Sequence, residues 1–287
     1  MSKPVVLVTG ANGQVGKELR QLAARYSQFQ FLFLSREDLP IHHFELVRNF
    51  FETAQPAYCI NCAAYTAVDK AETEKDLALL VNAESVGVLA AVSKLYNTRF
   101  LHISTDYVFD GTATEPYKED APVNPVNFYG STKLKGEEQC VQANADAIII
   151  RTSWVYSTFG NNFVKTMLRL MKERQSLNVV SDQFGSPTYA ADLAAAMLHI
   201  VSSENWQPGI YHYSNAGVIS WYDFAVAIQE LAGLNCIVNP IPTSAYPTPA
   251  KRPAYSVFDK EKIKKTYKLT IPQWKDSLKS CLTKIEA

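Results

Sequence analysis

The chain lacks an excess of charge of either sign. Its 287 residues include 28 Lys plus Arg and 28 Asp plus Glu, so the formal net charge is zero. A nucleic-acid-binding domain carries clustered positive charge, and a membrane-surface helix carries a basic amphipathic face. Neither pattern is present. The sequence therefore predicts no nucleic acid and no membrane among the partners of this protein.

Long hydrophobic runs and an export signal are also missing. The longest unbroken apolar run, Leu193 to Leu198, is far shorter than the roughly 20 residues that cross a bilayer. The N-terminus enters a strand-like run at once, without the pattern of a signal peptide. Cysteine is scarce and odd in number, at five residues. This usage is typical of reduced thiols and predicts a cytoplasmic protein.

Two of the cysteines form a C-x-x-C sequence, Cys59 and Cys62, inside a short apolar segment that is typical of a buried strand. Residues three apart on a strand face opposite sides, which is poor geometry for two ligands of one metal. No second pair follows. We interpret both thiols as structural and expect no metal site.

Apolar residues, by contrast, are plentiful at 47%, which excludes a disordered chain. In the first half, strand-like and helix-like segments alternate, which predicts βαβ units and a parallel sheet covered on both faces. The expected strands are 5–9, 29–34, 58–62, 99–105 and 147–151, and the expected helices are 14–26, 44–54, 75–96 and 129–144.

After Arg151 the pattern is less regular. We expect helices over 162–174, 190–203 and 272–286, another beginning at Ser220, and a strand over 209–215. Residues 239–253 carry five of the 14 prolines, which predicts an extended loop. The fold class is therefore α/β, a Rossmann-type doubly wound parallel sheet with a smaller C-terminal substrate-binding lobe. We expect residues 1–151 to bind a dinucleotide and residues 152–287 to be mainly the interleaved lobe, with the cleft between them.

A glycine-rich turn directly follows the first predicted strand and opens the first predicted helix. Gly10, Gly13 and Gly16 stand in the string VLVTGANGQVG. Glycine lets the backbone turn tightly and approach a pyrophosphate, and the helix N-terminus then offers N–H donors. This context favours a dinucleotide site over an ordinary turn.

The end of the second strand bears on the choice of cofactor. An acidic residue there is typical of a site that holds the ribose 2′-hydroxyl of NAD. This chain has Ser35 and Arg36 instead, and a hydroxyl and a guanidinium suit a 2′-phosphate. We therefore expect NADPH as the cofactor, with NADH accepted less well.

A third motif carries acid–base chemistry. Tyr129 and Lys133 are four residues apart and share one helix face. A cation beside the phenol lowers its pKa, so that the phenol can donate a proton to a carbonyl under reduction. Ser104 and Thr105 end the preceding strand, where their hydroxyls can reach the phenol and a substrate oxygen.

Taken in this order, the glycine turn, the Ser/Thr hydroxyl and Y-x-x-x-K resemble the extended short-chain dehydrogenase/reductase family. Finer strings resemble its dTDP-4-dehydrorhamnose reductases over residues 5–260, nearly the whole chain. The strings are GANGQVG, NCAAYTAVDKAE, STDYVFDG, NFYGSTKLKGE, RTSWVY, SDQFGSPTYAADLA and KRPAYSVFD.

The resemblance implies that NADPH or NADH reduces the C4 ketone of dTDP-4-dehydro-L-rhamnose to dTDP-L-rhamnose. It implies Tyr129 as proton donor, Lys133 on the nicotinamide ribose and Thr105 as their hydroxyl partner. Further cofactor positions match Gly13, Gln14 and Val15 at the phosphates, and Ala63, Ala64 and Tyr65 after the third strand. Substrate positions match Asp106 and Trp154, and Arg252 is a candidate for the diphosphate.

Two departures from the family pattern stand out. Pro40 precedes Ile41 where many members have an Asp-Ile pair near the adenine. Glu18 matches a glutamate that bridges a magnesium-linked dimer in some members, but Ala191 stands where another would be, so we carry over no metal and leave a homodimer open. Other readings are another sugar-nucleotide reductase or an epimerase, and a non-catalytic regulatory subunit of the same fold.

Overall fold

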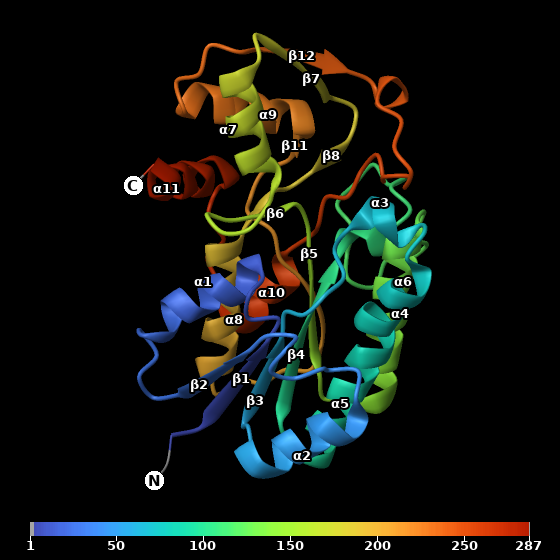
Figure 1. Cartoon of the computed structure of the whole chain (residues 1–287), viewed down its shortest axis with the longest axis vertical. Coiled ribbons are helices and arrows are strands. Elements are labelled where there is room, and N and C mark those ends of the chain that lie inside the picture. The colour runs from blue at the N-terminus through green and yellow to red at the C-terminus, as the bar shows by residue number, and fades with distance from the viewer. Residues whose placement is uncertain (1–2, 287) are drawn as a thin grey trace.

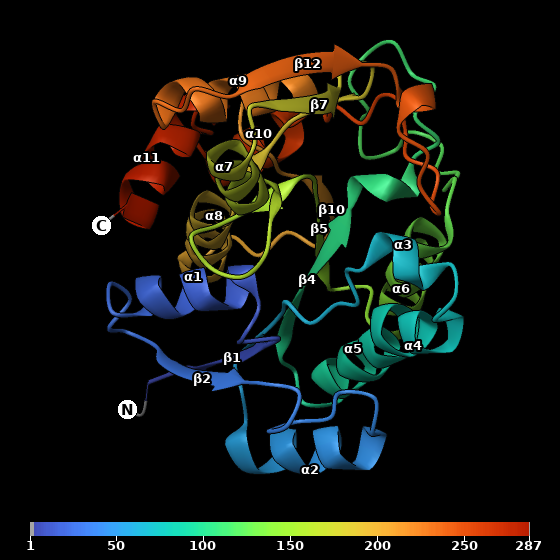
Figure 2. The ribbon, with the colours of Figure 1, turned by 45° about the horizontal axis from the view of Figure 1, so that its top comes forward.

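The computed structural model describes residues 3–286, and its centre is a six-stranded parallel sheet (Figures 1 and 2). The strand order is β10-β5-β4-β3-β1-β2. The strands are β1 (Val5–Thr9), β2 (Gln30–Leu34), β3 (Tyr58–Asn61), β4 (Arg99–Thr105), β5 (Ile148–Thr152) and β10 (Gly209–His212). The order reverses between β1 and β3, the kind of switch point at which open α/β sheets bind ligands. The predicted α/β fold class is confirmed.

Helices cover both faces of this sheet, because its strands are apolar on both sides. On β1, Val6 and Val8 pack into one core with α1 (Gln14–Ala23), α8 (Ala190–Ser202) and α10 (Glu261–Tyr267). Leu7, between them, packs into the opposite core, which is built with α2 (Phe44–Ala54), α5 (Ser85–Leu95) and α6 (Phe128–Ala143). Figure 1 shows α1 and α8 on one side of the strands and α5 and α6 on the other.

A second unit stands at the carboxyl ends of the strands, with its own core. That core includes Tyr156, Met167, Phe224, Ile228 and Leu282. The elements of this unit are β6 (Val155–Tyr156), α7 (Phe163–Glu173), β7 (Ser176–Val180), β8 (Phe184–Gly185), β9 (Thr188–Tyr189), β11 (Ile219–Ser220), α9 (Trp221–Leu231), β12 (Ile237–Ile241), the 3₁₀ turn η3 (Thr243–Ala245) and α11 (Trp274–Glu286). Between these elements, α8, β10 and α10 return to the first sheet. The division at residue 151 stays a prediction.

The expected loop over 239–253 is wrong at its beginning. Residues 237–241 form β12, which pairs in parallel with β7, and Pro240 lies within it. This two-stranded sheet leaves β12 with a free edge, where a proline that lacks an N–H is tolerated. Beyond η3 the segment is irregular, as expected.

The expected helix over 75–96 is one continuous stretch with a wide turn inside it. It comprises α4 (Lys75–Leu79), the π-helical turn η1 (Leu80–Glu84) and α5, and it follows the short α3 (Val68–Ala71). By length and composition alone, Lys75–Leu95 is apolar enough to cross a membrane, and half of its apolar window is buried inside the fold. The buried apolar side chains of α5 pack in the core shared with α2 and α6, and Ala78 of α4 packs in a small core with Tyr129, as those of a core helix do.

Candidate active site

The glycine-rich turn lies at the switch point between β1 and β3. Gly10 has φ +65°, and a Cβ there would stand 2.5 Å from the backbone nitrogen of Ala63. Only glycine fits this close approach of the turn to the segment after β3. Gly13 is the N-cap of α1 and supplies no side chain to cap it, and no acidic residue lies in the first helical turn. The first N–H groups of α1 are thus free to bind an anion.

A cleft of about 360 Å³ opens at this turn and gathers many of the predicted cofactor residues. Its lining includes Gly10, Gly13, Ser35, Arg36, Ala63 and Ala64, together with Ile41 and His42. Arg36 is exposed, and the Ser35 hydroxyl accepts a bond from Glu37 N at 3.2 Å. Ser35 therefore also shapes its own turn.

The remaining predicted cofactor residues lie outside the lining of this cleft. Val15 and Gly16 are buried in α1, where Gly16 packs against the glycine turn. Gln14 accepts a hydrogen bond from Asn162 Nδ2 at 2.9 Å, which ties the turn to the N-cap of α7. The backbone of Tyr65 is held at both its N–H and its carbonyl by Asn82 of η1, at 2.8 and 3.0 Å.

Tyr129 lies in the first turn of α6, against the end of β4. Asn127 caps the helix, accepting a bond from Gly130 N at 2.7 Å. A Cβ on Gly130 would stand 2.2 Å from the carbonyl oxygen of Tyr107, so glycine allows α6 to approach η2 (Asp106–Val108) closely. The Tyr129 ring meets the Tyr107 ring edge to face, with centroids 5.5 Å apart. Burial raises the pKa of Tyr129 to about 12, while Thr105 acts in the lowering direction. The phenol is thus protonated at neutral pH.

Two buried polar atoms at the end of β4 lack a hydrogen-bond partner among the residues that the structure describes. Thr105 Oγ1 donates to Asp106 Oδ1 at 3.1 Å, and burial raises the pKa of Asp106 to about 6. Asp106 Oδ2 and Ser104 Oγ are both buried and make no hydrogen bond among residues 3–286, while Ser256 stands close enough to the Asp106 carboxyl to act on its pKa in the lowering direction. Orphaned buried polar atoms are costly, so the Asp106 oxygen, whose carboxyl acts on the pKa of Tyr129, is a candidate contact for a ligand.

Lys133 lies one turn further along α6 and is 2% exposed. Its Nζ donates to the carbonyl of Ile103 at 2.7 Å and stands 3.4 Å from His102 Nε2. Burial lowers the pKa of Lys133 to about 8, while the carboxylate of Glu137 raises it. The structure therefore brings Thr105, Tyr129 and Lys133 together at the carboxyl end of β4.

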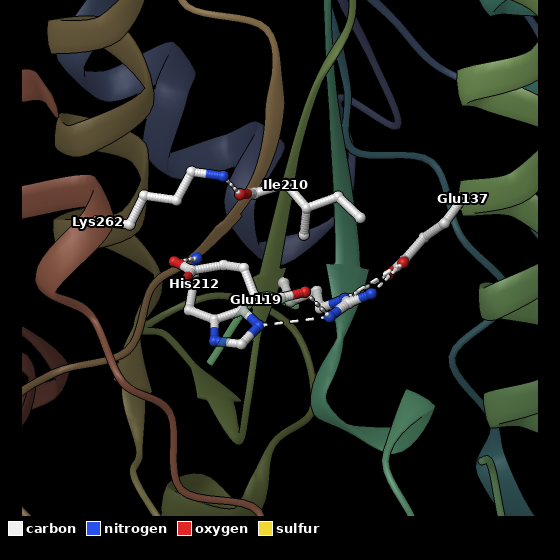
Figure 3. A network of polar contacts seen from close by, with 6 residues as sticks. Glu119, Glu137, Ile210, His212 and Lys262 are labelled. Atoms are coloured by element: carbon white, nitrogen blue, oxygen red, sulfur yellow. Dashed lines mark hydrogen bonds and ion pairs between the residues drawn. The ribbon is translucent and has the colours of Figure 1, made fainter. Parts of the chain in front are cut away.

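Glu137, a further turn along α6, forms an ion pair with Arg151 of β5 in the buried network of Figure 3. Arg151 Nε and Nη2 meet the two carboxylate oxygens at 2.9 and 2.7 Å, and both side chains are 3% exposed. His212 of β10 stands beside the guanidinium at 3.5 Å. The network fixes α6, the helix that carries Tyr129 and Lys133, to the strands of the sheet.

Trp154, a predicted substrate contact, lies between β5 and β6 with φ +48°. Its indole stacks on Trp221 with centroids 3.6 Å apart and packs directly against Gly185. Trp154 is partly buried against the second core. It is Trp221 rather than Trp154 that lines the neighbouring cleft.

That second cleft has a volume of about 610 Å³ and lies in the second unit, with Arg252 in its wall. Its lining is mostly apolar, including Phe163, Leu177 and Trp221. The guanidinium of Arg252 is already engaged, because Nη1 and Nη2 donate to the two oxygens of Asp69 at 3.0 and 2.8 Å. Asn127, the N-cap of α6, donates to the carbonyl of Lys251 at 2.7 Å, so the segment that carries Arg252 lies against the N-terminus of the helix that carries Tyr129.

The residues connected with magnesium in the resemblance are apart from this site. Glu18 is buried and accepts a bond from Ser157 at 2.6 Å, and its burial raises its pKa. Within residues 3–286, no group of three or more His, Cys, Asp or Glu is placed to hold a metal ion. All five cysteines are free thiols, and burial raises the pKa of both Cys59 and Cys62.

The sequence analysis assigned no role in the site to several residues that the structure places there. Asn61 and His102 lie side by side on β3 and β4, Asn82 holds the Tyr65 backbone, and Asp69 pairs with Arg252. The signal for the first two is a polar residue inside an otherwise apolar strand. Arg252, the partner of Asp69, lies 183 residues away in the sequence, and no local pattern predicts this pair.

Comparison with known proteins identifies the family of this chain. The family model described as the RmlD substrate binding domain matches residues 4–287. A dTDP-4-dehydrorhamnose reductase of Burkholderia thailandensis is 42% identical, with 96% of this chain and 97% of that protein covered. Crystal structures of such reductases from Clostridium acetobutylicum and from Bacillus anthracis, the latter in complex with NADP, are 42% and 38% identical. Both have a TM-score of 0.94 and cover 99% of this chain and 100% of theirs. The chain therefore belongs to the RmlD substrate-binding-domain family, among whose members are dTDP-4-dehydrorhamnose reductases.

Proposed function

We propose that this protein is an NADPH-dependent reductase that converts the C4 ketone of dTDP-4-dehydro-L-rhamnose to the alcohol of dTDP-L-rhamnose. One observation carries the proposal: a protonated, buried Tyr129 lies beside Thr105 and the unpartnered Asp106 oxygen, one helical turn from Lys133. The glycine-turn cleft and the larger cleft in the second unit supply room for a dinucleotide and for a sugar nucleotide.

Tyr129 is the proton donor of the proposed reaction. As the carbonyl carbon gains a hydride, its oxygen gains negative charge, and the phenolic proton passes to that oxygen. Thr105 Oγ1, beside the phenol, orients the carbonyl oxygen by a hydrogen bond. In its protonated form Lys133 stabilises the phenolate that remains, and a proton from solvent later restores the phenol.

The residues present fit a dinucleotide cofactor, which supplies the hydride when it is bound. The Gly10–Gly16 turn and the uncapped N-terminus of α1 would hold the pyrophosphate, with Gln14 and Val15 beside it. Ala63, Ala64 and Tyr65 would line the path toward the nicotinamide, and Lys133 would hold its ribose. Ser35 and Arg36 would meet the 2′-phosphate of NADPH, and NADH would be accepted less well.

The sugar nucleotide would occupy the larger cleft and reach Tyr129 past Tyr107. Asp106 would accept a hydrogen bond from a sugar hydroxyl, because its Oδ2 makes no hydrogen bond within the described part of the chain. Trp154 would contact the sugar from its stack with Trp221, and Arg252 would meet the diphosphate. The aromatic and apolar wall of the cleft suits a nucleobase.

Tyr129→Phe tests the proposal, since it keeps the ring and removes only the proton donor. We expect kcat to fall by about 10² to 10⁴ with NADPH binding nearly unchanged. Tyr107→Phe is the comparison variant, because its phenol is the neighbour of Tyr129 and should be dispensable for proton transfer. NADPH absorbance with the keto sugar nucleotide as substrate reports turnover. Wild-type kcat in the Tyr129 variant would overturn the assignment.

The same assay separates the alternatives. A non-catalytic regulatory subunit would show no turnover with any sugar nucleotide, although the complete Thr105, Tyr129 and Lys133 set disfavours it. Another sugar-nucleotide reductase would consume NADPH with a different substrate. An epimerase would consume no NADPH, and analysis of the sugar-nucleotide product would show an epimer in place of a reduced sugar. We also propose a cytoplasmic location, in keeping with five free thiols. A homodimer stays a prediction.

A further inference from the structure

A chain of buried polar side chains crosses the first sheet from β1 to the catalytic helix. Its members are Thr9, Asn61, His102 and Lys133, none more than 2% exposed. Thr9 is in register with Asn61, and Asn61 is in register with His102, so the side chains stand side by side on neighbouring strands. Burying a row of polar side chains in an apolar sheet costs free energy unless each polar atom forms a hydrogen bond.

The donors and acceptors along this chain determine which atom of each side chain donates and which accepts. The backbone N–H of Ala63 can only donate, and it meets Asn61 Oδ1 at 3.1 Å. Thr9 Oγ1 donates to the same oxygen at 2.6 Å. The amide nitrogen of Asn61 is therefore the atom that faces His102 Nδ1, at 3.0 Å. Because that nitrogen can only donate, Nδ1 of His102 must be an acceptor and carries no proton.

The remaining ring nitrogen faces the catalytic lysine. Burial holds the pKa of His102 well below its usual range, and a proton on Lys133 would lower that pKa further, so the ring is neutral in either state of the lysine. Its single proton is then on Nε2, which lies 3.4 Å from Lys133 Nζ. An ammonium group has no lone pair to accept this N–H, whereas a neutral amine has one.

The other groups near Lys133 do not reverse this preference. Those that act on its charge are Glu137 and Cys140, both on α6 itself. Both carboxylate oxygens of Glu137 accept hydrogen bonds from Arg151, so its charge is largely offset. Figure 3 labels Glu137 and marks its contacts with dashed lines. Burial raises the pKa of Cys140 to about 12, which keeps that thiol neutral.

We propose that His102 is a positioning residue that presents its Nε2–H to Lys133 and favours the neutral amine in the enzyme without cofactor. Ala63 lines the cofactor cleft, and its N–H donates to Asn61 of the chain. The chain therefore connects that cleft with Lys133. The tautomer follows from the contacts alone. Its consequence for the reaction rests on the proposed role of Lys133.

Nitrogen-15 NMR of histidine-labelled protein without cofactor tests the tautomer directly. The chain has five histidines, and the His102→Phe spectrum identifies the resonance that belongs to His102. We expect His102 to stay neutral, with its proton on Nε2, from pH 6 to 9. A proton on Nδ1, or a ring that titrates in this range, would overturn the inference. The measurement needs no turnover, so it stands apart from the outcome of Tyr129→Phe.

The pH dependence of kcat/KM tests the effect on Lys133. His102→Phe removes the N–H that stabilises the neutral amine, so Lys133 should keep its proton to higher pH. The alkaline limb should move up by about 0.5 to 1 pH unit, the shift expected from the loss of one hydrogen bond.

His212→Phe is the matched control, because His212 is equally buried, on β10, and contacts Arg151 rather than Lys133. It should leave the alkaline limb in place. If both variants moved the limb equally, or if His102→Phe lowered only the melting temperature, His102 would be a structural residue and not a positioning one.

Discussion

Asp106→Asn is expected to remove a pH-dependent penalty on the stability of this protein. The wild-type carboxyl is 2% exposed, and one of its oxygens has no partner. Burial raises its pKa from 3.8 to about 6, so the folded state binds a proton more tightly than the unfolded state does. Stability therefore falls as the pH rises from about 4 through 6, and the full cost is present above pH 6.

The size of this penalty follows from the pKa shift. A difference of roughly 2 units corresponds to about 3 kcal/mol. With about 2.1 cal/mol/K of unfolding entropy per residue, a chain of this length changes its melting temperature by about 5 °C for that free energy. An asparagine cannot ionise, so the variant escapes the penalty. The melting temperature of the variant minus that of the wild type should rise by about 5 °C between pH 4 and pH 7.

Scanning calorimetry or thermal-shift fluorescence across this pH range measures the difference. Asp110→Asn is a control of opposite sign. Hydrogen bonds from Thr112 hold the pKa of Asp110 below its usual value, so its ionised form stabilises the fold. That variant should lose stability relative to the wild type as the pH rises. A difference for Asp106→Asn that does not change with pH would refute the reasoning. The same variant should bind the sugar nucleotide more weakly, since Asp106 is the proposed acceptor for a sugar hydroxyl.

Three further predictions concern the cofactor, the substrate and the buried network. Arg36→Ala should reduce kcat/KM for NADPH relative to NADH by about fivefold at most, because an exposed pair contributes about 0–1 kcal/mol; an unchanged ratio would show that Arg36 does not meet the 2′-phosphate. Trp154→Phe should weaken substrate affinity more than it lowers the melting temperature, and the reverse result would assign Trp154 to the core alone. Arg151→Met should destabilise the fold by about 3–5 kcal/mol by leaving Glu137 buried and unpaired, and denaturant unfolding should show most of this loss recovered in the double variant with Glu137→Leu.

The sequence by itself determined the local elements and the chemistry attached to their ends. Strand β1, helix α2 and strand β4 begin and end where the alternation of apolar segments predicts. Ser220 caps α9, which begins where the sequence predicts, and Asp223 completes a capping box with it. The sequence also predicted the glycine turn at Gly10 and the placement of Tyr129 and Lys133 on one face of a helix. The reason is physical: hydrophobic period, helix capping and the φ of a glycine depend on residues within a few positions of one another.

Tertiary structure decided which distant residues meet. The pairing of β7 with β12 joins short segments about 60 residues apart, and neither segment has a pattern that specifies its partner. Arg252 pairs with Asp69, and Trp154 stacks on Trp221, because the fold of the whole chain brings these segments together. The contact of His102 with Lys133 likewise depends on the register of β1, β3 and β4 and on how α6 packs against these strands. Such contacts are set by packing and by the need to pair buried polar atoms, and both are properties of the assembled fold rather than of any local segment.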